Sequence, residues 1–159
     1  MRYSGPLPSL ALAVMLMGSS GLPAFRDFET RPQLRLMAMT ELMAGDMGHY
    51  FVKATIKKSD IQVMVDTGAS VVALSYEDAQ SAGLRPGTLT FDVPVSTANG
   101  SVKAARAKLD RVEIESVRVD DVDALVLPTG ALNGTLLGMS FLSKLSSFKS
   151  ENGVLTLKN

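Results

Sequence analysis

From about residue 48 onward, hydrophobic and polar residues alternate in short runs, the pattern of strands with one buried face. Some runs are almost wholly apolar, as expected of strands that are buried on both faces. The runs are 50–56, 61–65, 89–97, 102–109, 112–119, 124–127 and 154–157. Polar or glycine-containing stretches separate them. The pattern therefore predicts a mainly β domain.

Three of the separating stretches have the composition of hairpin turns. Residues 57–60 are polar, and 98–101 contain Asn-Gly, the strongest short-range hairpin signal. A second Asn-Gly at 152–153 predicts a closing hairpin between 147–149 and 154–157. Each of these three turns is therefore expected to join two antiparallel strands.

Two short helices are expected between the strands. Ser75 has the character of an N-cap, and Asp78 three residues later completes a variant of the capping box. A helix over 76–82 would then end at Gly83 in the left-handed conformation. A second short helix is predicted over 139–145.

An aspartate lies between two of the apolar runs. Asp66 follows 61–65, and the sequence Thr67-Gly68-Ala69-Ser70 leads into a second apolar run, Val71 to Leu74. A buried carboxylate is costly unless it is compensated, and Gly68 lets the chain turn sharply and bring amide groups toward it. This predicts a carboxylate on a tight loop, screened from bulk water, with a pKa that can be tuned for chemistry. The alternative is a structural Asx-turn.

At these residues the chain resembles the retropepsin-like aspartic proteases, single-domain homodimeric relatives of pepsin. The resemblance rests on the string MVDTGAS at 64–70 and on the later Leu-Leu-Gly at 136–138, with a hairpin between them. Segments 93–100 and 137–142 look most like the bacterial membrane-associated or periplasmic branch. The fold implied is mainly β: a small closed β-barrel-like domain with a flap hairpin and one or two short helices, one lobe per chain.

The resemblance also implies an activity and its residues. Asp66 would be catalytic, and hydrolysis would use a water activated between the Asp66 carboxyls of two subunits, because one carboxyl cannot act as both base and acid. The support of the active-site loop would come from Thr67, Gly68, Ala69 and Ser70. The flap would be Thr97, Ala98, Asn99, Gly100 and Ser101. The pocket candidates are Val71, Leu136, Leu137 and Gly138, with Ala98 of the flap.

The composition of the chain limits the classes of partner that it is expected to bind. The chain has 159 residues, 16 basic and 16 acidic, so no net charge points to nucleic acid. It has no cysteine and a single histidine, His49, which we interpret as a polar residue at a strand start. Asp120, Asp121 and Asp123 lack the glycine and distal glutamate of a calcium loop, and a solvated acidic turn is expected there. We expect no metal and no cofactor. The expected partners are a second copy of the chain and an extended peptide.

The N-terminal region differs from the rest. Residues 1–25 have a basic start, an apolar core and small residues, the layout of a signal peptide or a short membrane anchor. Residues 26–45 fit neither period well and suggest a linker or pro-region, with a short helix around 39–44 as an alternative. The protease domain is expected over 46–159. The location expected is outside the cytoplasm: periplasmic, or anchored in the inner membrane facing the periplasm.

Two alternatives to the protease remain at this point. One is a catalytically weak retropepsin-fold module for peptide binding or dimerisation. The other is a structural β domain in which Asp66 is only a turn residue.

Overall fold

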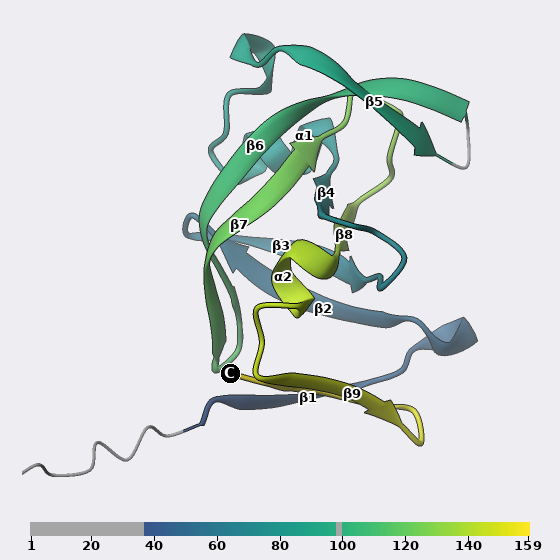
Figure 1. The fold of residues 1–159 in the computed structure, drawn as a ribbon, viewed down its shortest axis with the longest axis vertical. Helices are drawn as coiled ribbons and strands as arrows, with labels where there is room; N and C mark the ends of the chain where they lie inside the picture. The colour runs from purple at the N-terminus through teal and green to yellow at the C-terminus, as the bar shows by residue number, and fades with distance from the viewer. Residues whose placement is uncertain (1–36, 98–99) are drawn as a thin grey trace, which may run out of the picture. The chain divides into compact units, whose positions relative to one another are not determined.

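The computed structural model describes residues 37–97 and 100–159 (Figure 1). The strands are β1 (Met39–Met43), β2 (Tyr50–Ile56), β3 (Ser59–Val65), β4 (Val72–Leu74), β5 (Phe91–Thr97), β6 (Gly100–Ile114), β7 (Val117–Val126), β8 (Thr135–Leu137), β9 (Ser147–Glu151) and β10 (Val154–Lys158). The helices are α1 (Tyr76–Ser81) and α2 (Met139–Leu142), with 3-10 turns at Asp46–Gly48 and Pro86–Thr88.

Six strands close into a barrel. The hydrogen-bonded order is β2-β3-β8-β4-β7-β6, and β6 pairs again with β2 at Thr55 and Ile56. Fully buried side chains fill the interior, among them Ile56, Leu74, Leu109, Ile114, Leu137 and Phe141. Burying this apolar surface is the main source of stability. The predicted fold class, a small closed β-barrel with a flap hairpin and short helices, is confirmed.

The flap hairpin extends from the barrel. β5 pairs only with β6, with Thr97 opposite Gly100, and in Figure 1 this hairpin lies above the barrel. Along β5 the side chains alternate between half-buried and exposed, with Phe91, Val93 and Val95 on the half-buried face as predicted. The tip residues Ala98 and Asn99 lie outside the described residues.

The predicted start of the domain at residue 46 is too late. Met39–Met43 is a strand, not the linker or the helix expected for 26–45, and it pairs antiparallel with β10. Thr40 and Leu42 are buried against the barrel, whereas the alternate residues are exposed. The period of two is clear over these five residues, but the partner strand is more than a hundred residues away. The rest of the expected linker, 26–36, and the whole of 1–25 lie outside the described residues.

The closing hairpin is confirmed. β9 and β10 pair around a two-residue turn, Asn152 and Gly153, with φ of 51° and 76°. Together with β1 they form a second sheet in the order β1-β10-β9, in which β9 is a free edge among residues 37–97 and 100–159. All five residues of β9 are exposed.

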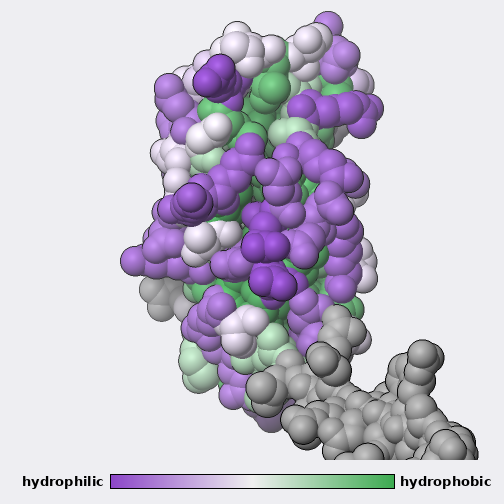
Figure 2. Space-filling model, turned by 90° about the vertical axis from the view of Figure 1, so that its left-hand side faces the viewer, coloured by the Kyte–Doolittle hydropathy of each residue, from purple (hydrophilic) through white to green (hydrophobic). Residues whose placement is uncertain are grey.

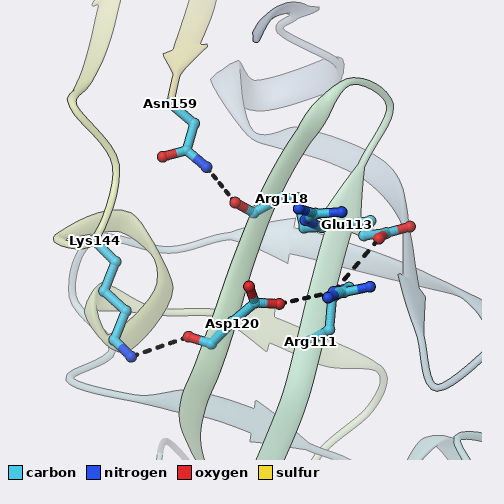
Figure 3. A network of polar contacts seen from close by, with 6 residues as sticks. All are labelled: Arg111, Glu113, Arg118, Asp120, Lys144 and Asn159. Atoms are coloured by element: carbon cyan, nitrogen blue, oxygen red, sulfur yellow. Dashed lines mark hydrogen bonds and ion pairs between the residues drawn. The ribbon is translucent and has the colours of Figure 1, made fainter. Parts of the chain in front are cut away.

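The acidic turn expected around Asp120 is instead part of a continuous strand. β7 runs from Val117 to Val126 and pairs along its length with β6, which places Asp120 opposite Arg111. Arg111 Nε donates to Asp120 Oδ1 at 2.7 Å, and this hydrogen bond lowers the pKa of Asp120. Figure 3 shows Lys144 donating to the backbone oxygen of Asp120 and Asn159 donating to the backbone oxygen of Arg118. Lys144 also donates to the backbone oxygen of Asp121. Cross-strand charge pairing therefore replaces the turn.

The outward face of strands β6 and β7 is strongly hydrophilic. Figure 2 shows this side of the molecule, where hydrophilic side chains cover most of the surface. The inward residues of the same strands, such as Val112 and Val119, are buried. This is the one-face-in, one-face-out division that the alternating sequence predicted.

Both predicted helices form, each after a short barrel strand. Ser75 accepts a hydrogen bond from the Asp78 backbone N–H at 3.0 Å, and Gly83 has a φ of 72°, as expected for the end of α1. The Asp78 carboxylate accepts from Thr135 Oγ1 at 2.7 Å, so it links α1 to β8. The helix predicted over 139–145 is shorter, Met139–Leu142.

Candidate active site

Asp66 lies where β3 leaves the barrel. Its backbone N–H donates to Leu137 O of the neighbouring strand β8 at 3.1 Å, which continues the parallel pairing of Val65 with Leu137. The chain then turns: Gly68 N–H donates to Asp66 Oδ1 at 2.8 Å, and Ala69 N–H donates to Asp66 O at 3.3 Å. The predicted amide donor to the carboxylate is confirmed.

A second segment, 137–140, holds this loop from behind. Met139 N–H donates to Ala69 O at 2.8 Å, and Ser140 N–H donates to Ser70 O at 3.1 Å. The contact is so close that a Cβ on Gly138 would lie 2.2 Å from Val71 O and 2.6 Å from Ala69 O. Residue 138 must therefore be glycine for the two backbones to approach.

The burial expected for Asp66 is not reached within one chain. Asp66 is half-buried, and Thr67 and Gly68 are exposed. Ile61 and Val63 before the loop and Val72 and Leu74 after it are buried, but the loop between these strands leaves the core and turns outward. The carboxylate is thus fixed in position by the barrel while its outer side stays accessible.

A cavity of about 370 Å³ opens beside the carboxylate. Asp66 and Thr67 line it together with residues from two distant parts of the chain, Gly48 to Tyr50 and the β9–β10 hairpin. Its lining residues are Gly48, His49, Tyr50, Val65, Asp66, Thr67, Phe148, Ser150 and Leu155. Tyr50 OH and Ser150 Oγ are 2.7 Å apart, which ties the two distant parts together. A concave site with a few convergent polar groups is the usual setting of binding or catalysis.

The sequence did not reveal all of these neighbours. His49 was predicted to be an ordinary residue at a strand start, yet it lines the cavity with Asp66. Phe148 was assigned only to a strand of the closing hairpin, and Ser150 was assigned to no element. Ser140 lies in segment 137–142, which carries part of the resemblance, but nothing in the sequence indicated that its hydroxyl accepts from Val72 N–H at 3.0 Å. Each joins the site through contacts across more than 15 positions of sequence, so no local pattern could have identified them.

The predicted pocket residues divide into two kinds. Val71 and Leu136 are half-buried and remain candidates for contact with a ligand. Leu137 is fully buried and belongs to the barrel core, and Gly138 packs against the loop backbone. These two support the site from inside and do not line its surface, which corrects the expectation for them.

The predicted flap residues are described only in part. Thr97 Oγ1 donates to Gly100 O at 2.8 Å, and Gly100 and Ser101 are exposed. Ala98 and Asn99, predicted at the tip, lie outside the described residues.

The barrel contains a second loop arranged like that of Asp66. β7 leads through 127–134 into β8 and α2, as β3 leads through 66–71 into β4 and α1. The parallel pairs are β3 with β8 and β4 with β7, so the two loops are related across the barrel. The second loop carries Pro128-Thr129-Gly130, with proline at the position of the acid. One chain therefore provides one such aspartate. Across residues 37–97 and 100–159 there is no cluster of three or more metal-ligating side chains.

Comparison with known proteins identifies the family that the chain resembles. Residues 52–144 match the family model described as "gag-polyprotein putative aspartyl protease". Among solved structures, a retropepsin-like aspartic protease from Rickettsia conorii superposes with a TM-score of 0.69 at 33% identity, over 77% of this chain and 91% of that one. An EIAV protease superposes with a TM-score of 0.52 at 18% identity, over 64% of this chain and 91% of that one, a likeness of fold alone.

Two curated relatives are uncharacterised proteins. One, from the cobV 5′ region of Sinorhizobium sp., is 43% identical over 112 residues, 70% of this chain. The other, from Rickettsia prowazekii, is 38% identical over 114 residues, 72% of this chain. The chain spans about half the length of both, 48% in each case.

Proposed function

Since the chain belongs to the family of retropepsin-like aspartic proteases, we propose that it is an aspartic endopeptidase that works as a homodimer. In this proposal a water molecule is activated between the Asp66 carboxyls of two subunits and attacks a peptide bond. The observation that carries the proposal is the position of Asp66: a barrel-fixed loop, an amide hydrogen bond to Oδ1, and an accessible outer side.

The need for two subunits follows from the chemistry. One carboxylate must accept a proton from the attacking water while one carboxylic acid polarises the scissile carbonyl. Two carboxyls about 3 Å apart hold a single proton between them because they do not both ionise at that distance. The second barrel loop has Pro128 where an acid would be needed, so the partner carboxyl comes from a second copy. A twofold axis beside Asp66 would supply it.

The free edge of β9 is our candidate for the surface that pairs. Ser150 of this strand lines the cavity of Asp66 and contacts Tyr50, whose ladder partner Val65 directly precedes Asp66. A twofold axis that passes close to Ser150 would therefore lie beside the cavity that Asp66 lines. In a hairpin with a two-residue turn, the residues flanking the turn bond to one another. By that alternation Ser150 directs its N–H and C=O to the free edge.

Charge complementarity favours one register of this pairing. Two antiparallel copies of β9 centred on Ser150 would place Lys149 opposite Glu151 of the other copy, twice. The two side chains already form a 2.7 Å ion pair within one chain and are about two-thirds exposed. Lysine on an edge strand normally discourages pairing, and a facing glutamate would remove that penalty.

The substrate class we propose is an extended peptide. It would lie between the β5–β6 flap and the Asp66 loop and be held by strand-like main-chain bonds, with side chains in pockets. Val71 and Leu136 are the candidates for pocket contacts because they are half-buried near the loop. The half-buried apolar face of β5 would cover the peptide and exclude water.

We also propose that the chain acts outside the cytoplasm, in the periplasm or at the inner membrane. This rests on the sequence of residues 1–25 alone, which has the layout of a signal or short anchor. In the part of the chain that the structure describes, no helix is long and apolar enough to cross a membrane.

The decisive experiment compares the wild-type chain with Asp66→Asn on a peptide library across pH. Asp66→Asn should abolish cleavage while the circular dichroism spectrum and sedimentation stay unchanged. Asp110→Asn, an exposed aspartate on β6, is the matched control and should cleave normally. A wild-type protein that dimerises and binds peptides without turnover would instead establish the peptide-binding module. Cleavage that survives in Asp66→Asn would refute the proposal.

The β9 pairing has its own test by charge reversal. Lys149→Glu and Glu151→Lys should each weaken dimerisation in sedimentation, because each brings like charges face to face across the axis. The double variant restores opposite charges and should dimerise like the wild type. Equal behaviour of all four proteins would exclude this edge as the interface and leave the role of Asp66 untouched.

A further inference from the structure

We infer that the Ser140 hydroxyl is a positioning group for Asp66, holding the exit of the catalytic loop at the angle that pairing with a second carboxyl requires. The inference rests on the proposed function for its catalytic consequence. Its structural consequence can be measured without any activity. Ser140 lies on α2, two residues after Gly138, and the sequence assigned it no role of its own.

The hydroxyl joins three elements. Ser140 Oγ accepts from the Val72 N–H at the first residue of β4, at 3.0 Å, and donates to Asp123 O of β7, at 2.6 Å. Val72 and Ala124 are the first partners of the parallel β4–β7 pair. The hydroxyl therefore lies at the end of this ladder. It pairs with one backbone donor, Val72 N–H, and one backbone acceptor, Asp123 O, that the β4–β7 pairing leaves without a partner.

The other ties that segment 137–140 makes to the loop all come from the backbone. They are the bonds from Asp66 N–H to Leu137 O, from Met139 N–H to Ala69 O and from Ser140 N–H to Ser70 O. They hold the entry and the middle of the loop. Within the described residues, the bond from Val72 N–H to Ser140 Oγ is the one side-chain bond by which this segment holds the exit.

Replacing Ser140 would act on the exit of the loop, where β4 begins at Val72. Val72 is fully buried, so its N–H has no access to water once the hydroxyl is removed. Such an unpaired buried donor is unfavourable, and β4 can relieve it only by shifting. A shift of β4 moves Val71 and the loop as far as Asp66. Catalytic carboxyl pairs tolerate little displacement, since a misplacement of about 1 Å can cost about 100-fold in rate.

The test is Ser140→Ala against the matched control Ser143→Ala. Ser143 lies directly after the same short helix, is exposed, and donates to Met139 O at 2.7 Å, with no bond to the loop. Ser140→Ala should lower kcat on a cleaved peptide by about tenfold or more with little change in KM, because the loss is one of geometry. Ser143→Ala should keep the wild-type kcat. Ser140→Thr retains the hydroxyl and should recover most of the rate; a threonine variant as slow as alanine would overturn the inference.

A second measurement separates this inference from the proposed function. In Ser140→Ala, amide hydrogen exchange should accelerate at Val72. It should also accelerate at Met139, whose N–H donates to Ala69 O, and at Ala69, whose N–H donates to Asp66 O. Acceleration at Val72 alone would mean that the hydroxyl acts only locally, and the inference would fail. If no peptide is cleaved by any variant, the proposed activity fails while the exchange result still decides the role of Ser140.

Discussion

Gly138→Ala tests whether the Asp66 loop depends on the close approach of two backbones. The added Cβ would lie 2.2 Å from Val71 O and 2.6 Å from Ala69 O. Both atoms belong to the backbone, so no side-chain rotation relieves the contact. Residue 138 has a φ of −91°, which any residue can adopt. The effect of the substitution is therefore purely steric.

The magnitude follows from the distances. The nearer oxygen must retreat from 2.2 Å to at least 3.0 Å, and it is carried by the loop that bears Asp66. Overpacking of a close-packed site typically costs about 1–3 kcal/mol, and a clash with two fixed oxygens belongs at the upper end, about 3 kcal/mol. For a folded unit of this size, Arg35–Asn159, about 4 °C of Tm corresponds to each kcal/mol, so Tm should fall by about 12 °C.

The assay is thermal unfolding followed by circular dichroism, with peptide cleavage measured in parallel. Gly87→Ala is the matched control, because its Cβ would meet only the Tyr76 hydroxyl at 3.5 Å, an ordinary contact. We expect Gly87→Ala to stay within about 2 °C of the wild type, as surface substitutions do. A Gly138→Ala protein with an unchanged Tm and full cleavage would refute the argument that the loop needs this contact.

Two further predictions concern polar contacts of the barrel. Thr135→Val should cost about 1–3 kcal/mol in urea unfolding, because it leaves the half-buried Asp78 carboxylate without the 2.7 Å hydroxyl donor. Thr135→Ser keeps that donor and should cost only the buried methyl group, about 1 kcal/mol or less. As pH falls into the acid range, Tm should fall less steeply in Asp120→Asn than in the wild type. The hydrogen bond from Arg111 lowers the pKa of Asp120 in the folded chain, so its stabilising contribution is present above about pH 4, the unfolded value, and is lost as pH falls through the lower folded value. Asp120 is exposed, so the change should be small, and a steeper acid loss of Tm in Asp120→Asn would contradict the assignment.

The elements that the sequence predicted well are those set by neighbours along the chain. The Ser75 cap, the left-handed Gly83 and the Asn152-Gly153 turn depend on a few adjacent residues, and all three appear as expected. The Asp66 loop belongs to the same class, since its amide donor Gly68 is two positions away. Local conformation and alternation are properties of the chain before it folds.

The errors in the prediction share one cause, which is contact between distant segments. Residues 39–43 form a strand because β10 offers a ladder to them. Asp120 stands in a strand and not in a turn because Arg111 faces it from β6. Leu137 is core and not pocket because the barrel closes around it. In each case the local residues permitted the predicted state, and pairing across the fold selected another.

The amino-acid sequence alone determined the family, the mainly β architecture and the aspartate with its turn, because these follow from residue types at fixed short spacings. Tertiary structure alone decided which atoms surround that aspartate: Gly138 pressed against the loop, Ser140 at its exit, and Ser150 across the cavity. Such neighbours are brought together only when the barrel closes, since no spacing along a chain specifies which distant backbones will meet.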